Sequence, residues 1–169
     1  MARLIMVCGQ VGAGKTTYAY RLSDELSAIR FSIDPWMQTL FSQDMGELDY
    51  EWMINRVYRC YDQIWEVSAQ ILGRGGNVIL DLGFTEKTQR EQFYARVQRV
   101  GIEPELHYLE VPVDVRRNRV AQRNEEQDPR FYAFEVTGFM FDFMETRFEV
   151  PGADEVKSLK IVSGLSPAS

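Results

Sequence analysis

A glycine-rich segment near the beginning of the sequence has the residue types that hold a chain of phosphates. Residues 9–16 read Gly-Gln-Val-Gly-Ala-Gly-Lys-Thr, which matches the pattern GxxxxGK[ST] between an apolar run and a stretch with helical spacing. Glycines let successive backbone N–H groups turn toward phosphate oxygens, and a helix beginning at Lys15 adds its positive dipole end. A chance glycine-rich turn would lack this context. The pattern therefore predicts a site for the phosphates of a nucleoside triphosphate.

Two side chains at the end of this segment have the charge and the metal chemistry that phosphoryl transfer needs. We expect Lys15 to act as a catalytic point charge on the β- and γ-phosphates, and the Thr16 hydroxyl to ligate Mg²⁺. ATP and Mg²⁺ are the expected cofactors. The predicted nucleotide-binding residues are Gly9, Gln10, Val11, Gly12, Ala13, Gly14, Lys15, Thr16 and Thr17.

Asp34 follows a predicted strand, in the run Phe-Ser-Ile-Asp-Pro-Trp at residues 31–36. Open α/β folds place their ligands at the carboxyl ends of strands. A carboxylate there can orient an acceptor hydroxyl and take its proton while the γ-phosphate moves to the oxygen. The alternative is a helix N-cap ahead of Pro35. We expect Asp34 to be the catalytic base.

Asp81 ends the apolar run Val-Ile-Leu-Asp at residues 78–81. In P-loop enzymes an acidic residue in this place holds Mg²⁺ through its water shell, which is the role we expect for Asp81. A strand-end aspartate that only accepts N–H groups of the following turn is the alternative. Gly83 and Thr85 come directly after it and are expected near the acceptor pocket.

Arginines are densest after residue 112, on a presumed helix, and helical spacing places Arg116, Arg119 and Arg123 on one face. Arginines that close over a site from a lid stabilise the charge of the transferring oxygens. We expect Arg119 and Arg123 to have this catalytic role, in a small lid spanning about residues 112–135, with Arg130 a little further on. The alternative is a solvated face paired with the acidic residues 125, 126 and 128.

Short apolar runs alternate with longer stretches of helical spacing, which is typical of a parallel sheet covered by helices in a three-layer α/β fold. The predicted strands are Arg3–Cys8, Arg30–Ile33, Asn77–Leu82, Glu105–Val111 and Leu159–Val162. Helices are predicted at Lys15–Leu26, from Asp49 to about Leu72, from a capping box at Thr88–Glu91 to near Gly101, and after a cap at Thr137. Trp52 and Trp65 are interpreted as core residues, as is His107, because its strand neighbours are apolar.

The length and the net charge of the chain limit the number of domains and the classes of partner. A chain of 169 residues with 45% hydrophobic composition fits one domain over residues 1–169. The net charge of −6 disfavours nucleic acid and anionic membranes, and no apolar run is long enough for a membrane helix. Cys8 and Cys60 are too few for a disulfide framework, so we interpret both as reduced and the location as cytoplasmic. A small-molecule hydroxyl acceptor is the predicted partner; no protein partner is predicted.

These residues together resemble the P-loop kinases with an adenylate-kinase-like core, which include zeta-toxin-like, chloramphenicol-phosphotransferase-like and polynucleotide 5′-kinase-like proteins. The resemblance rests on residues 9–16, Asp34, residues 78–83, the two lid arginines and the run Phe-Glu-Val-Pro at 148–151. It implies a five-stranded parallel sheet in the order 2-3-1-4-5 and a transfer of the γ-phosphate of ATP. Many relatives have an arginine three residues after the base, where this chain has Met37. With Trp36, Phe41 and Phe84, this favours an acceptor that has an apolar portion.

No Asn-Lys-x-Asp segment that reads guanine and no Leu-Ser-Gly-Gly-Gln segment of transport ATPases occurs in the sequence, which favours a small kinase. Two other functions stay open. The chain could be a nucleotide-dependent switch or binding protein with slow chemistry. It could also be a polynucleotide 5′-hydroxyl kinase, although its acidic balance argues against binding single strands.

Overall fold

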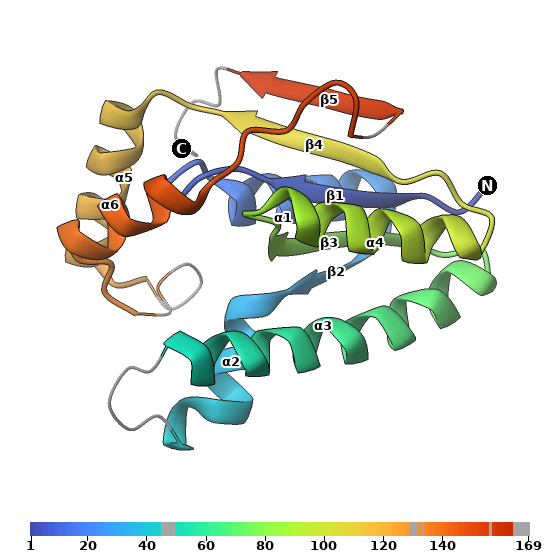
Figure 1. Cartoon of the computed structure of the whole chain (residues 1–169), viewed down its shortest axis with the longest axis horizontal. Coiled ribbons are helices and arrows are strands. Elements are labelled where there is room, and N and C mark those ends of the chain that lie inside the picture. Colours follow the sequence, from blue (N-terminus) through green and yellow to red (C-terminus); the bar gives the residue numbers. More distant parts are fainter. Residues whose placement is uncertain (45–49, 129–131, 133, 156, 164–169) are drawn as a thin grey trace.

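The structure is a computed structural model that describes residues 1–44, 50–128, 132, 134–155 and 157–163. Five parallel strands form its central sheet. Their order is β2-β3-β1-β4-β5, as the resemblance to P-loop kinases implied (Figure 1). The strands are β1 (Leu4–Cys8), β2 (Ala28–Ser32), β3 (Asn77–Gly83), β4 (Glu105–Glu110) and β5 (Ser158–Ser163). All four pairs are parallel, so the carboxyl ends of the strands meet at one edge of the sheet.

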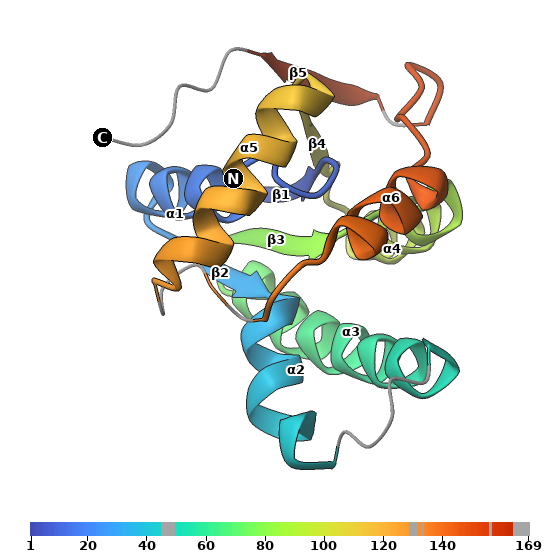
Figure 2. The same cartoon turned by 90° about the vertical axis from the view of Figure 1, so that its left-hand side faces the viewer.

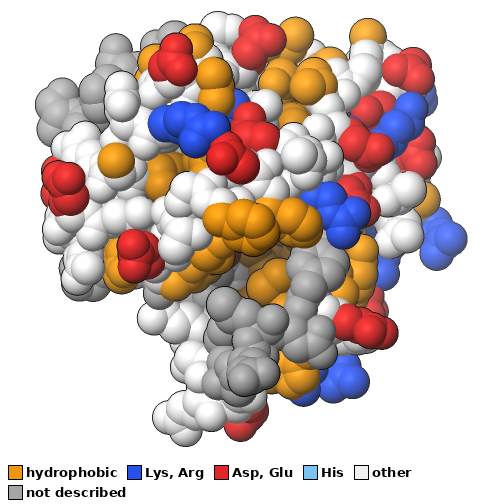
Figure 3. Space-filling view, turned by 60° about the vertical axis from the view of Figure 1, so that its left-hand side comes forward, with side chains coloured by type: hydrophobic (Ala, Val, Ile, Leu, Met, Phe, Trp, Pro, Cys, Tyr) orange, Lys and Arg blue, Asp and Glu red, His pale blue; other side chains and the backbone are white. Residues whose placement is uncertain are grey.

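Helices cover both faces of this sheet and gather beyond its carboxyl edge. They are α1 (Lys15–Leu26), α2 (Ile33–Phe41), α3 (Tyr50–Gly73), α4 (Lys87–Arg99), α5 (Val113–Glu126) and α6 (Gly138–Arg147), with a short 3₁₀ turn, η1 (Ser42–Asp44), after α2. Helices α2, α5 and α6 lie at the carboxyl edge of the sheet, and Figure 2 views the molecule from that edge. A band of hydrophobic side chains crosses the surface on this side of the molecule (Figure 3).

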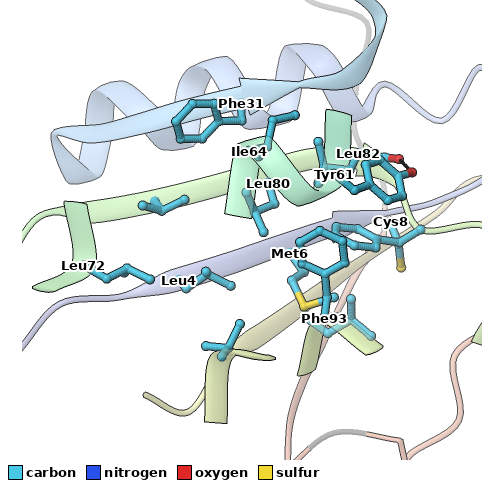
Figure 4. Close-up of a cluster of buried hydrophobic side chains, with 14 of the residues drawn as sticks. Leu4, Met6, Cys8, Phe31, Tyr61, Ile64, Leu72, Leu80, Leu82 and Phe93 are labelled. Atoms are coloured by element: carbon cyan, nitrogen blue, oxygen red, sulfur yellow. Dashed lines mark hydrogen bonds between the residues drawn. The ribbon is translucent and has the colours of Figure 1, made fainter. Parts of the chain in front are cut away.

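Alternate residues of the central strand β1 point to opposite layers, and all five are fully buried. Leu4, Met6 and Cys8 join the larger core with residues of α3 and α4, such as Ile64 and Phe93 (Figure 4). The other two, Ile5 and Val7, join the smaller core under α1. Because β1 is buried on both faces, its carboxyl end is rigidly placed, and the glycine-rich loop starts from that fixed point.

Most predicted elements are confirmed, and the differences have local causes. Strand β2 begins at Ala28, earlier than predicted, because Ser27 turns the chain with φ 47° directly after α1. It ends at Ser32, and Ile33 already begins α2. The predicted capping box at Thr88–Glu91 is wrong: Glu86 caps α4, exchanging hydrogen bonds with Gln89. The cap at Thr137 is confirmed, because its side chain accepts a hydrogen bond from the Met140 N–H.

Several predictions about buried residues can also be decided. Trp65 packs against the larger core, whereas Trp52 packs outside it, edge-on to Phe41. Cys8 and Cys60 are buried free thiols, and burial raises the pKa of Cys8 to about 12. None of the helices in the described ranges is both long and apolar enough to cross a membrane.

Candidate functional site

The loop between β1 and α1 takes its shape from two glycines with left-handed backbone conformations. Gly12 has φ 78° and Gly14, the N-cap of α1, has φ 90°. A Cβ atom at Gly12 would lie 2.5 Å from the backbone oxygen of Arg116 in α5, so the position has no room for a side chain. These two residues bend the loop over the N-terminus of α1, where the free N–H groups of the first helical turn can receive phosphate oxygens.

Lys15 is the first residue of α1, and its ammonium group folds back over the loop. The Nζ atom donates to the backbone oxygens of Gly9 at 2.7 Å and of Gln10 at 3.1 Å. Burial lowers the pKa of Lys15, while the nearby carboxylates of Asp81 and Asp34 raise it. A cation held by two carbonyl oxygens and facing two carboxylates lies where the phosphate chain of a nucleotide would replace those carbonyls as its partner.

Asp81 lies within β3 rather than at its end, and its side chain is 4% exposed. Burial raises its pKa, and the charge of Lys15 and a hydrogen bond from Thr16 oppose that rise. Arg30 and Ser32, both on β2, also donate to its Oδ2 atom. Its described partners are thus side chains of β2 and α1, unlike those of a carboxylate that only caps a turn. A hydroxyl and a carboxylate side by side are oxygen donors that fit Mg²⁺.

Asp34 is exposed and lies in the first turn of α2, one residue inside the helix. The N-cap of α2 is Ser32, so the N-cap alternative for Asp34 is wrong. Its carboxylate raises the pKa of Lys15 and of Arg123 and acts on Asp81 too. Asp34 therefore lies near enough to Lys15 of the phosphate loop and to Arg123 of α5 for its charge to act on both.

The arginines of α5 divide into two pairs. Arg116 is 2% exposed and is committed to structure: its guanidinium forms two bonds to Glu145 of α6, and its Nε donates to Val111 at 2.9 Å. Arg117 is an exposed partner of Asp142, also on α6. These two residues attach α5 to α6. Arg116 Nη1 also donates to the backbone oxygen of Val11 at 3.3 Å, so Arg116 and Arg119 contact the phosphate loop from the same face of α5, as the helical spacing predicted.

Arg119 and Arg123 lie one and two turns further along α5 and face the phosphate loop. Arg119 Nη1 donates to the backbone oxygen of Ala13 at 3.3 Å. Burial lowers the pKa of Arg123, and Asp34 is the first charge that raises it. The lowering of the Arg123 pKa is thus opposed mainly by the charge of Asp34 on α2, and not by the acidic residues that follow Arg123 on α5. Arg130 lies outside the described residues.

On the side of the site where we expect the acceptor, α2 carries apolar side chains. Trp36, Met37 and Phe41 are half-buried and pack on the margin of the larger core. The prediction that Phe84 lines this side is wrong, because Phe84 is fully buried between Tyr61 and Phe93.

Residues that no sequence pattern singled out hold the backbone of the segment after Asp81. Arg90, only 1% exposed, donates to the backbone oxygens of Phe84 and Thr85 and pairs with Glu155 at 2.7 Å. The N–H group of Glu149 donates to the same Thr85 oxygen. Neither Arg90 nor Arg30 belongs to a sequence motif, so their positions beside the site were recognised only from their burial in the structure.

His107 is a core residue, as predicted. It is 2% exposed in β4, and its Nδ1 atom lies 2.8 Å from the hydroxyl of Tyr18 on α1. Burial lowers the pKa of His107, while nearby Glu105 raises it. The histidine lies beneath α1, and the charge of Lys160, its neighbour on β5, also lowers its pKa.

Comparisons with known proteins agree with this architecture. The sequence profile of the family described as "AAA domain" matches residues 4–151, which include the phosphate loop, Asp34, Asp81 and α5. No curated protein matches the sequence.

Solved structures from several organisms have the same fold. Kti12 of Chaetomium thermophilum, in complex with ADP-AlF3, superposes with a TM-score of 0.72 at 19% identity, covering 95% of this chain and 88% of that one. A putative kinase from Chloroflexus aurantiacus gives 0.73 at 19% identity, with 96% and 85% covered. The Mycobacterium tuberculosis APS kinase CysC, in complex with AMPPNP and APS, gives 0.64 at 13%, with 95% and 88% covered. At these identities the likeness establishes the fold.

Proposed function

This chain belongs to the family described as AAA domain and shares the fold of P-loop kinases, and from that premise we propose that it transfers the γ-phosphate of ATP to a hydroxyl group of a small molecule. The observation that carries the proposal is the electrostatic coupling of three elements at one edge of the sheet. Asp34 on α2 acts on Lys15 of the phosphate loop and on Arg123 of α5. A carboxylate in this place can accept the proton of an acceptor hydroxyl.

In the proposed reaction the acceptor oxygen attacks the γ-phosphorus in line. The bond from that phosphorus to the β–γ bridging oxygen breaks, and ADP leaves with its electron pair. Asp34 accepts the proton of the attacking hydroxyl. Lys15, Arg119 and Arg123 balance the negative charge on the transferring oxygens. Thr16 and Asp81 would hold Mg²⁺, which when bound neutralises charge between the β- and γ-phosphates.

The acceptor that fits this site is an alcohol with an apolar portion. On the side of Asp34 away from the phosphate loop, α2 offers Trp36, Met37 and Phe41, and the position that is basic in many similar kinases is a methionine. Aromatic and sulfur side chains contact apolar groups and give little attraction to an anion. A sugar-like or antibiotic-like alcohol is therefore favoured over a phosphorylated acceptor.

The test is a transfer assay with γ-labelled ATP and Mg²⁺ against a panel of alcohols, sugars, nucleosides and 5′-hydroxyl oligonucleotides. We expect labelled product from the wild type, and about 10²–10⁴-fold less from Asp34→Asn, with nucleotide affinity and melting temperature unchanged. Asp24→Asn removes an equally exposed carboxylate on α1 and should leave transfer intact. The proposal fails if Asp34→Asn transfers phosphate as fast as the wild type, or if no acceptor is labelled.

An apolar face on α6 favours a second function, a nucleotide-dependent switch that binds a protein. Phe139 is 81% exposed on this helix, and Phe134 just before it is 53% exposed. Because α6 is attached to α5, nucleotide contacts made by α5 could change what this face presents. Under this function, Phe139→Ser would abolish ATP-dependent partner capture, while Asp34→Asn would leave it intact.

A further inference from the structure

Arg30 of β2 and Asp81 of β3 form an ion pair in the layer between the sheet and α1. Arg30 Nη1 lies 3.1 Å from Asp81 Oδ2, and the two side chains are only 12% and 4% exposed. The pair is diagonal, because the residue directly opposite Asp81 in the sheet is Ser32. Ser32 Oγ donates to the same Oδ2 atom at 3.4 Å. Two donors on β2 therefore hold one oxygen of the predicted metal-site carboxylate.

The guanidinium of Arg30 is itself held from α1. Its central carbon lies 3.9 Å from the ring centroid of Tyr20, in cation–π contact. Arg30 thus connects the helix that begins with Lys15 to the strand that presents Asp81. A planar, always charged guanidinium suits this place, because it can stack on the ring and bond to the carboxylate together.

We propose that Arg30 is a positioning residue for the magnesium site, an inference that rests on the proposed function. Held by Arg30, the carboxylate of Asp81 cannot rotate freely, so it keeps the orientation in which Thr16 bonds to it. Without Arg30, the carboxylate can turn toward Lys15, whose charge also acts on it, and a metal bound to the turned carboxylate would be misplaced for transfer. Arg30 acts through Asp81 and touches neither substrate.

Arg30 has a second, opposite effect on the metal. It places a positive charge beside the carboxylate that must attract a divalent cation, so its electrostatic contribution weakens metal binding. The two effects separate by experiment. Loss of orientation lowers turnover, whereas loss of the charge strengthens binding of the cation, and a residue with a merely structural role would weaken both.

The test compares Arg30→Met with the wild type, using Mn²⁺ as the metal probe in the presence of ADP. Binding is measured by electron paramagnetic resonance, and turnover and melting temperature are measured in parallel. We expect Arg30→Met to bind Mn²⁺ about 10-fold more tightly. We expect its kcat for phosphate release or transfer to fall by about 10-fold or more, as for a misplaced catalytic group. Arg21→Met, which removes an exposed arginine of α1 paired with Glu25, should change neither quantity.

Two further variants separate the orientation effect from the charge effect and cover the case in which Arg30→Met does not fold. Tyr20→Leu removes the ring on the other side of Arg30 at a 44% exposed position, so it should fold even if Arg30→Met does not. Because it keeps the charge of Arg30, its Mn²⁺ affinity should stay at the wild-type value, while kcat falls by less than in Arg30→Met. Arg30→Lys keeps the charge and should restore wild-type Mn²⁺ affinity while kcat stays low. Unchanged or weaker Mn²⁺ binding in Arg30→Met, or an unchanged kcat in Tyr20→Leu, would overturn the inference. If no acceptor is phosphorylated but Mn²⁺ binding tightens as expected, the proposed function fails and the inference about the metal site stands.

Discussion

The two sides of the candidate site differ in what forms them: the nucleotide side consists mainly of loop backbone, and the acceptor side consists of side chains of α2. On the nucleotide side, β1 is fully buried, the loop after it is fixed by Gly12 and Gly14, and the backbone of that loop is bonded by Lys15 and Arg119. On the acceptor side, α2 has no buried residue, and the surface consists of half-exposed side chains. A backbone site needs a fixed set of residues, whereas a side-chain surface can change its ligand with each substitution. Under the proposed function, this difference favours the loop as the part that binds ATP and α2 as the part that selects the acceptor.

The largest expected effect is a loss of phosphate transfer on substitution of a residue of the nucleotide side. Lys15→Ala should lower phosphate transfer by on the order of 10²–10³-fold, because the charge that meets the β- and γ-phosphates is lost. The fold should persist, since the ammonium contacts only two carbonyl oxygens of its own loop. Turnover and a circular dichroism melt provide the measurements, with Lys160→Ala on the exposed strand β5 as the control. A collapsed melt in Lys15→Ala would show instead that the residue is structural.

A pair of glycine variants tests whether the loop is fixed by contact as well as by conformation. Gly12 and Gly101 have almost the same φ, 78° and 76°, but a Cβ atom at Gly101 meets nothing within 4 Å. Gly101→Ala should cost about 1 kcal/mol from backbone strain alone. Gly12→Ala adds the clash with Arg116 and should cost roughly 2–4 kcal/mol. Urea denaturation measures both, and equal losses would mean that α5 yields to the new side chain.

On the acceptor side, a substitution should change selection without affecting the nucleotide. Met37→Arg should raise kcat/KM for a phosphorylated alcohol relative to its neutral parent by about 10-fold, because an arginine can pair with the added phosphate. Met37→Leu keeps an apolar side chain and should leave the ratio unchanged. Competition assays with the two alcohols measure the ratio, while ATP affinity should stay constant in both variants. A changed ATP affinity would show that α2 also contributes to the nucleotide side.

The smallest expected effect concerns pH and the core beneath α1. Because the folded-state pKa of His107 lies below its ordinary value of 6.5, the unfolded chain binds more protons as the pH falls through that value. The stability that neutral His107 contributes is therefore full above about pH 6.5 and is lost toward lower pH. His107→Gln should flatten the fall in urea midpoint between pH 7 and pH 5.5. An equally steep fall in that variant would assign the dependence to other groups.

The sequence determined the elements whose residues act locally. The pattern at residues 9–16 predicted the phosphate loop because its glycines and lysine act within one turn of chain, and the alternation of apolar runs predicted the α/β class. Asp34 and Asp81 were singled out because each follows or ends an apolar run in the sequence, and both lie toward the carboxyl edge of the sheet. Their chemical roles stay predictions.

Only the tertiary structure decided what depends on contacts between distant residues. Four arginines on one helix look alike in sequence, but pairing with Glu145 and Asp142 assigns two of them to the α5–α6 contact. Phe84 became a core residue and Arg30 a partner of Asp81 because neighbouring strands and α3 bring their partners to them. A local pattern fixes which backbone shape a segment takes, while the partner of a long side chain is set by packing across the whole fold.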